Sequence, residues 1–379
     1  MSDPRPPPAH VTVLDGLRGV AVLVVLVYHF AWTFSERGPV TATIAACTRV
    51  GWVGVDLFFV LSGYLITRGL VARSDLPHRA RLARFWARRF LRIFPLYYLV
   101  LLVGTAVALL VHAETPGAAY WLYLQNYTLP FDAWDRVRWT SHLWSLAVEE
   151  QFYLGWPLII LLRRPGGQAA LAMTILVTAT VLRVVLLFHL PGLSRSVVAK
   201  LVYCATLTHA DGLVLGALVA IAHTHAPELT TRLTRRFGRS VAGLAYCGVV
   251  FLAVVTRGFN QYDRRVAVLG YPLVAVAFAV TVGLAVDGAL PPRMTSALSR
   301  SWVTSVGRVS YAMYLFHWPL VALLIAPVLR LEGAMTDAQV LTFGGLYIVV
   351  GTAGTYAAAR VSFVLVESPF LRLKQRFAG

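Results

Sequence analysis

Charged residues are scarce in this chain, and their scarcity decides its class. Only 13% of the 379 residues are charged, whereas soluble domains carry about 25%. Hydrophobic residues make up 58% of the chain, and the mean hydropathy is +0.68. This composition excludes an ordinary soluble domain. It predicts an all-α, multi-pass transmembrane bundle in the cell membrane, surrounded by membrane lipid.

Among the charged residues, acidic residues and lysine are scarce, and arginine dominates. Asp and Glu number 17 against 34 Lys and Arg, which gives a net charge of +17. Only Lys200 and Lys374 are lysines. In a soluble protein this balance would indicate nucleic acid as a partner, but membrane proteins collect basic residues in their cytoplasmic loops. We therefore expect no nucleic-acid partner.

Several motifs with a defined chemistry are missing. The three cysteines (Cys47, Cys204 and Cys247) form no CxxC pair, so the sequence predicts no disulfide framework. Histidines form one HxH pair, His223 and His225, and no HxxxH motif, and we expect no bound metal. No Walker-type phosphate loop and no GxSxG elbow occur, which argues against an ATP-driven pump and against a serine hydrolase of that type.

Long apolar segments are abundant. A membrane-spanning helix needs about 20 mostly apolar residues, and ten segments are candidates. They are 13–32, 52–70, 94–112, 142–162, 169–190, 201–222, 241–256, 266–286, 305–329 and 339–366. With both termini cytoplasmic, the inner segments hold roughly twice as many basic residues as the outer ones, as the positive-inside rule requires. We divide the chain into a flexible tail (1–12), a transmembrane domain (13–370) and a basic cytoplasmic tail (371–379).

The first span carries three ionisable residues, Asp15, Arg18 and His29. Ionisable groups inside a membrane helix are costly and usually face a bundle interior or a water-filled cavity. Arg18 and His29 are eleven residues apart, close to three helical turns, so they share one helix face about 16 Å apart. The pattern admits a structural role for His29 as well as a catalytic one, since a neutral imidazole is a good general base.

Further polar residues lie in later spans. The second span contains Asp56 and a small polar break, Ser62-Gly63-Tyr64. Asp56 could simply pair with an arginine of another helix, and small residues let helices or ligands approach closely.

Arg89 and Arg92 enter the membrane three residues apart, on one side of a helix. Arginine forks bind phosphate oxygens bidentately, although ordinary positive-inside anchoring also explains them. Glu149 and Glu150 lie in the fourth span, pointing about 100° apart, so at least one should be buried and paired. His317 lies inside the ninth span.

Six segments occur in an order that resembles a known family. They are LDGLRGVAVLVVLVYH, GWVGVDLFFVLSGYLIT, RRFLRIFP, LWSLAVEEQFYLGWPL, SYAMYLFHWPL and ESPF. Together they resemble the acyltransferase 3 family of integral membrane O-acyltransferases, and the resemblance covers most of the chain. It implies transfer of an acyl group, usually acetyl, from cytoplasmic acyl-CoA to a hydroxyl. The acceptor would be a sugar of a cell-envelope glycan or of a secondary metabolite such as an antibiotic. Many members carry an extra hydrolase-like domain, and we expect this chain to act without one.

The resemblance also implies roles for the residues already named. His29 would be the catalytic base, and Asp56 or a glutamate would orient its ring. Arg18, Arg89 and Arg92 would hold the phosphates of the donor. Direct transfer and an acyl-histidine intermediate both remain open.

Other matched positions receive less specific roles. Glu149 or Glu150 fills the acidic catalytic position, while His317, Tyr64 and Ser62 are candidates for binding substrate. The competing prediction is a transporter or flippase of acyl donors or glycans, because a ten-helix bundle with buried charges would look much the same.

Overall fold

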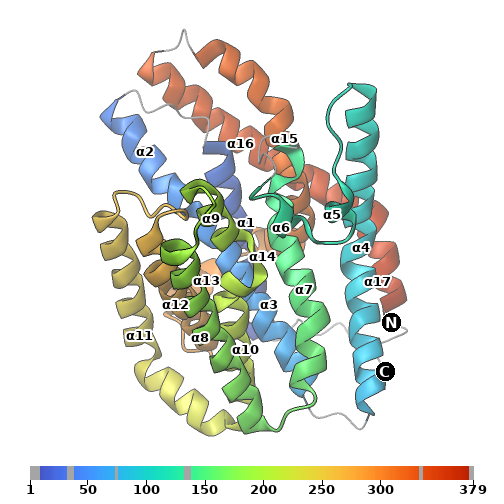
Figure 1. The fold of residues 1–379 in the computed structure, drawn as a ribbon, viewed down its shortest axis with the longest axis vertical. Coiled ribbons are helices and arrows are strands. Elements are labelled where there is room, and N and C mark those ends of the chain that lie inside the picture. Colours follow the sequence, from blue (N-terminus) through green and yellow to red (C-terminus); the bar gives the residue numbers. More distant parts are fainter. Residues whose placement is uncertain (1–8, 32–37, 73–75, 132–137, 333–335, 375–379) are drawn as a thin grey trace.

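The computed structural model describes residues 9–31, 38–72, 76–131, 138–332 and 336–374 (Figure 1). Regular structure in these ranges is entirely helical, which confirms the all-α prediction. Parts of the two predicted tails, residues 1–8 and 375–379, lie outside the described ranges.

Within these ranges, seven helical segments are long and apolar enough to cross a membrane, and the chain is a multi-pass membrane protein. Three of the spans combine several elements: α2 (Pro39–Arg49) continues through η1 (Val50–Trp52) into α3, η4 (Val266–Gly270) continues into α12, and α16 continues through η5 (Phe363–Glu367) into α17 (Ser368–Lys374). The principal helices of the seven are α1 (Ala9–Ala31), α3 (Val53–Val71), α4 (His78–Leu110), α8 (Pro165–His189), α11 (Pro227–Val255), α12 (Tyr271–Val286) and α16 (Asp337–Ser362).

The other three predicted spans are also helical but are not among these seven. The span predicted at 142–162 is α7 (Trp144–Ile160), preceded by η2 (Arg138–Leu143). The one at 201–222 is divided into α9 (Arg195–Cys204), η3 (Thr206–Thr208) and α10 (Asp211–His225). The one at 305–329 is divided into α14 (Ser301–Arg308) and α15 (Ser310–Glu332). The count of ten and the cytoplasmic location of both termini therefore stay predictions.

Short helices complete the structure. α5 (Ala118–Trp121) and α6 (Gln125–Thr128) follow α4, and α13 (Pro292–Leu298) precedes α14. Figure 1 shows α11 and α12 at one side of the bundle and α4 with α17 at the other, with α3 and α7 between them. The hydroxyls of Tyr97 and Tyr98 on α4 donate to the carbonyls of Tyr120 and Trp121, which fixes α5 against α4.

Glycines fix the position of α1, the helix that carries Arg18 and His29. A methyl group on Gly307 of α14 would lie 1.8 Å from the Asp15 carbonyl oxygen, and one on Gly16 would lie 2.1 Å from the Leu298 carbonyl oxygen. Small residues at such crossings let helix backbones touch. These contacts fix the position of α1 along its axis relative to α13 and α14.

The segment Ser62-Gly63-Tyr64 does not break its helix, because α3 is continuous from Val53 to Val71. Gly63 instead serves packing. A methyl group there would lie 1.9 Å from the Leu213 carbonyl oxygen of α10, and one on Gly216 would lie 2.1 Å from the Val60 carbonyl oxygen. The two glycines let the backbones of α3 and α10 touch.

Candidate functional site

Two cavities contain most of the residues singled out from the sequence. The histidine cavity has about 580 Å³ of space between atoms. The elements that bound it are α1, η1, α3, η2, α7, α9, α15 and the loop before α12. Its lining residues are Tyr28, His29, Trp52, Val55, Ser141, His142, Trp144, Tyr203, Gln261, Tyr262, Tyr314 and Trp318.

His29 lines the cavity and is hydrogen-bonded to His317, which does not line it. His317 Nδ1 is 2.6 Å from the Tyr314 carbonyl oxygen, and its Nε2 is 2.9 Å from His29 Nδ1. A carbonyl only accepts, so in a neutral pair His317 carries its proton on Nδ1 and accepts at Nε2. His29 Nδ1 then donates, and His29 Nε2 holds the lone pair. This chain of two bonds sets the tautomer that a general base needs.

The arginine cavity has about 710 Å³ of space between atoms and contains the three predicted arginines. Arg18 lies on α1, and Arg89 and Arg92 lie on α4. Arg18 is only loosely paired with Asp15, at 4.0 Å. Arg89 lies over the rings of Phe85 and Tyr153. Within the described ranges, no hydrogen bond or ion pair occupies the Arg89 or Arg92 guanidinium, so both have donors left for an anion.

Both glutamates of α7 line the arginine cavity. Glu149 Oε1 accepts a 2.6 Å hydrogen bond from the Ser62 hydroxyl, and Ser62 in turn accepts one of 3.0 Å from Tyr153. Glu150 also borders a neighbouring groove between α4 and α7. The two carboxylates therefore have different surroundings, as their angular separation predicts, although both reach the same cavity.

Two residues, Val55 and Tyr314, line both cavities and form part of the wall between them. The Tyr314 hydroxyl donates to the His142 carbonyl at 2.9 Å and lies 2.6 Å from the Ser145 hydroxyl. Because Ser145 lines the arginine cavity, this contact joins the two cavity walls. Arg18 and His29, predicted to share one face of α1, thus border two adjacent cavities.

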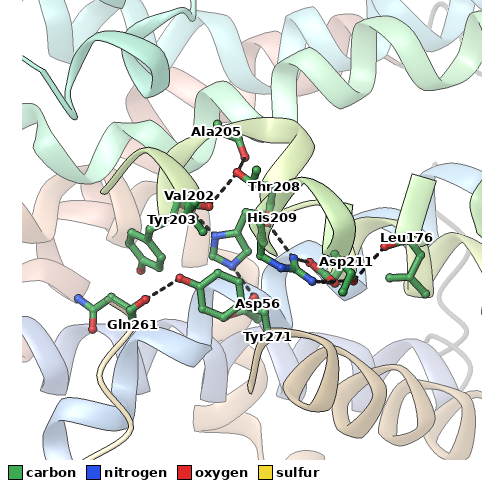
Figure 2. A network of polar contacts seen from close by, with 12 residues as sticks. Asp56, Leu176, Val202, Tyr203, Ala205, Thr208, His209, Asp211, Gln261 and Tyr271 are labelled. Atoms are coloured by element: carbon green, nitrogen blue, oxygen red, sulfur yellow. Dashed lines mark hydrogen bonds and ion pairs between the residues drawn. The ribbon is translucent and has the colours of Figure 1, made fainter. Parts of the chain in front are cut away.

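Asp56 has a different partner from the one expected. Its Oδ1 is 2.9 Å from His209 Nε2, and His209 Nδ1 is 2.6 Å from the Tyr203 carbonyl oxygen (Figure 2). Asp56 is fully buried and lines neither cavity. The structure therefore shows His317, and not Asp56, hydrogen-bonded to the His29 ring.

The network in Figure 2 continues through the break between α9 and α10. Arg183 of α8 makes a bidentate ion pair with Asp211, and its guanidinium also donates to the Thr208 carbonyl. The Tyr271 ring stacks on His209 at 4.5 Å between centroids. These contacts fix the interrupted helix, which suggests that Asp56 supports the fold.

Of the other two residues predicted to bind substrate, one lines a cavity and one is buried in the core. Ser62 lines the arginine cavity, whereas Tyr64 is buried, lines neither cavity and accepts a hydrogen bond from Arg68 at 3.0 Å. Three further residues of the two cavities, Ser145, Tyr314 and Tyr153, were not predicted. Tyr314 could have been found, because it lies one helical turn before His317. No three His, Cys, Asp or Glu side chains in the described parts of the chain are arranged to hold a metal ion.

The fold and the two cavities define a multi-pass helical membrane protein with a polar interior. A family model described as an acyltransferase domain matches residues 11–360. The chain belongs to this acyltransferase family, as the resemblance in its six motifs predicts.

Among curated proteins, the chain is similar to several bacterial O-acetyltransferases. It is 28% identical over 95% of its length to peptidoglycan O-acetyltransferase OatA of Listeria monocytogenes, covering 56% of that protein. It is 26% identical over 94% of its length to putative peptidoglycan O-acetyltransferase YrhL of Bacillus subtilis, covering 54%. It is 27% identical over 83% of its length to O-acetyltransferase OatA of Staphylococcus aureus, covering 51%. The chain thus spans about half the length of these relatives. No solved structure matches the chain.

Proposed function

We propose that this protein is a membrane O-acetyltransferase that uses acetyl-CoA to acetylate a hydroxyl of a cell-envelope glycan. The observation that carries the proposal is the pair of adjacent cavities, one with three arginines and one with an oriented histidine. The names of the relatives support acetyl as the group transferred and a peptidoglycan sugar as the acceptor.

The arginine cavity would bind the donor. CoA carries several phosphates, and guanidinium forks are suited to phosphate oxygens. Arg89 and Arg92 fit this role because neither is engaged in an ion pair with a described carboxylate, and Arg18 is held only weakly by Asp15. With the predicted orientation, this cavity faces the cytoplasm, where acyl-CoA is available. The thioester arm would then extend toward Tyr314.

The histidine cavity would hold the acceptor hydroxyl. His29 Nε2 takes the hydroxyl proton while the oxygen attacks the thioester carbonyl carbon. A C–O bond forms, the C–S bond breaks, and the proton passes from His29 to the departing thiolate, which yields the ester and free CoA thiol. General-base catalysis of this kind contributes about 10²–10⁴-fold. Because Tyr314 lies in the wall between the cavities, transfer requires its side chain to move.

The proposal is tested with purified protein in proteoliposomes, supplied with acetyl-CoA carrying a labelled acetyl group and with soluble peptidoglycan fragments. We expect labelled acetyl esters on the glycan, detected by mass spectrometry, and one equivalent of free CoA thiol per ester. A transporter would move donor or glycan across the bilayer without forming an ester, and that result would contradict the proposal.

A further inference from the structure

His142 is a polar residue of the histidine cavity that has no part in the proposed transfer. Only 4% of its surface is exposed, and it lies at the end of η2, just before α7. Neither of its ring nitrogens has a hydrogen-bond partner among the described residues. An unsatisfied buried polar group is destabilising, so a native protein that keeps one usually has a ligand or a water for it.

The chemistry of the missing partner follows from the neighbours of the ring. The backbone carbonyls of Tyr314 and Leu315 approach His142, but neither meets hydrogen-bond geometry with it. Even a better-aligned carbonyl could satisfy only the N–H of a neutral imidazole, because carbonyls do not donate. The other nitrogen needs a donor. A hydroxyl group supplies one.

The lining of the cavity has the chemistry that binds a sugar ring. His29 and His142 flank His317, each with its ring centroid 4.9 Å from that of His317. Most other lining residues are Trp or Tyr, including Trp144 and Trp318. Ligand sites typically combine such aromatic walls with a few placed polar groups. A pyranose presents apolar C–H faces to aromatic rings and hydroxyls at its edge.

We infer that the histidine cavity is the acceptor-binding site and that His142 accepts a hydrogen bond from a second donor of the acceptor sugar, a hydroxyl or an acetamido N–H. This inference rests on the proposed function. His29 takes the proton of the reacting hydroxyl, while His142 accepts from a second O–H or N–H group of the same sugar. The site therefore selects sugars that carry such a second donor over simple alcohols.

Binding is measured without catalysis by titrating the full chain with soluble peptidoglycan fragments and following tryptophan fluorescence, since Trp52, Trp144 and Trp318 line the cavity. His142→Phe keeps a ring but no nitrogen, and we expect the glycan Kd to rise about tenfold. His142→Gln keeps an acceptor oxygen, and its Kd should stay within about threefold of wild type. His223→Phe, at the distant end of α10, is the matched control and should bind as wild type does.

The same samples are titrated with acetyl-CoA, whose Kd should not change in either His142 variant. An unchanged glycan Kd in His142→Phe would overturn the inference, and would indicate that water satisfies the ring. Equal losses of donor and glycan binding, or a wild-type protein that does not bind the glycan, would also overturn it. Glycan binding by wild type without any acetyl transfer would instead contradict the proposed function and leave the binding site standing.

Discussion

The hydrogen bond from His29 to His317 leads to a quantitative prediction. In His317→Leu, His29 Nδ1–H loses the His317 nitrogen as an acceptor inside the bundle, where His317 is fully buried, and the Val25 carbonyl is the acceptor still near the ring. An unsatisfied buried donor costs about 1–3 kcal/mol. If the ring avoids this cost by leaving the reactive orientation or tautomer, kcat falls by about 5- to 150-fold, since 1.4 kcal/mol is a factor of ten. The loss should be smaller than the general-base contribution itself.

The assay is acetyl transfer to soluble peptidoglycan fragments at saturating acceptor, with kcat and the KM for acetyl-CoA measured separately. KM should be unchanged, because His317 lines neither cavity. His317→Gln retains an acceptor oxygen and should recover part of the rate. His223→Leu is the control. His223 Nε2 lies 3.1 Å from an Asp287 carboxylate oxygen, and neither residue lines the two cavities. A His317→Leu variant with wild-type kcat would refute the reasoning.

Three further predictions follow from the same structure. Arg89→Ala should raise the KM for acetyl-CoA about tenfold or more, because a hydrogen bond to a charged group is worth about 1.5–3 kcal/mol; an unchanged KM would remove Arg89 from the donor site. Gly63→Ala should lower the thermal midpoint in detergent, because a new methyl group would overlap the α10 backbone. A methyl group on Gly69 of the same helix would have no atom within 4 Å, so Gly69→Ala should be neutral or slightly stabilising. Equal shifts of the thermal midpoint in the two variants would contradict this packing account. Asp56→Asn should lower the thermal midpoint while kcat stays within about threefold, and a large loss of kcat at unchanged stability would return Asp56 to the catalytic role predicted from the sequence.

The sequence predicts the helical class, and it singles out residues that the structure places at two cavities, because intramembrane charge is costly and therefore informative. Arg18, Arg89, Arg92 and both α7 glutamates line one cavity, and His29 lines the other. Spacing along α1 correctly indicates that Arg18 and His29 face the same interior.

Pairings between helices could not be predicted from the sequence. Asp56 and His29 are both intramembrane groups, and nothing in their local sequence shows that Asp56 meets His209 while His29 meets His317. Such contacts depend on where backbones cross, which here is set by glycines such as Gly63. For the same reason, the Ser62-Gly63-Tyr64 segment reads as a break in the sequence but is a packing contact in the structure.

In the proposed mechanism, His29 moves the proton of the acceptor hydroxyl. The most direct test compares single-turnover acetyl transfer by wild type and His29→Asn in proteoliposomes, at equal protein and with acetyl-CoA binding measured on the same samples. The account predicts a transfer rate lower by about 10²–10⁴-fold with an unchanged Kd for acetyl-CoA. Transfer at the wild-type rate by His29→Asn would contradict it.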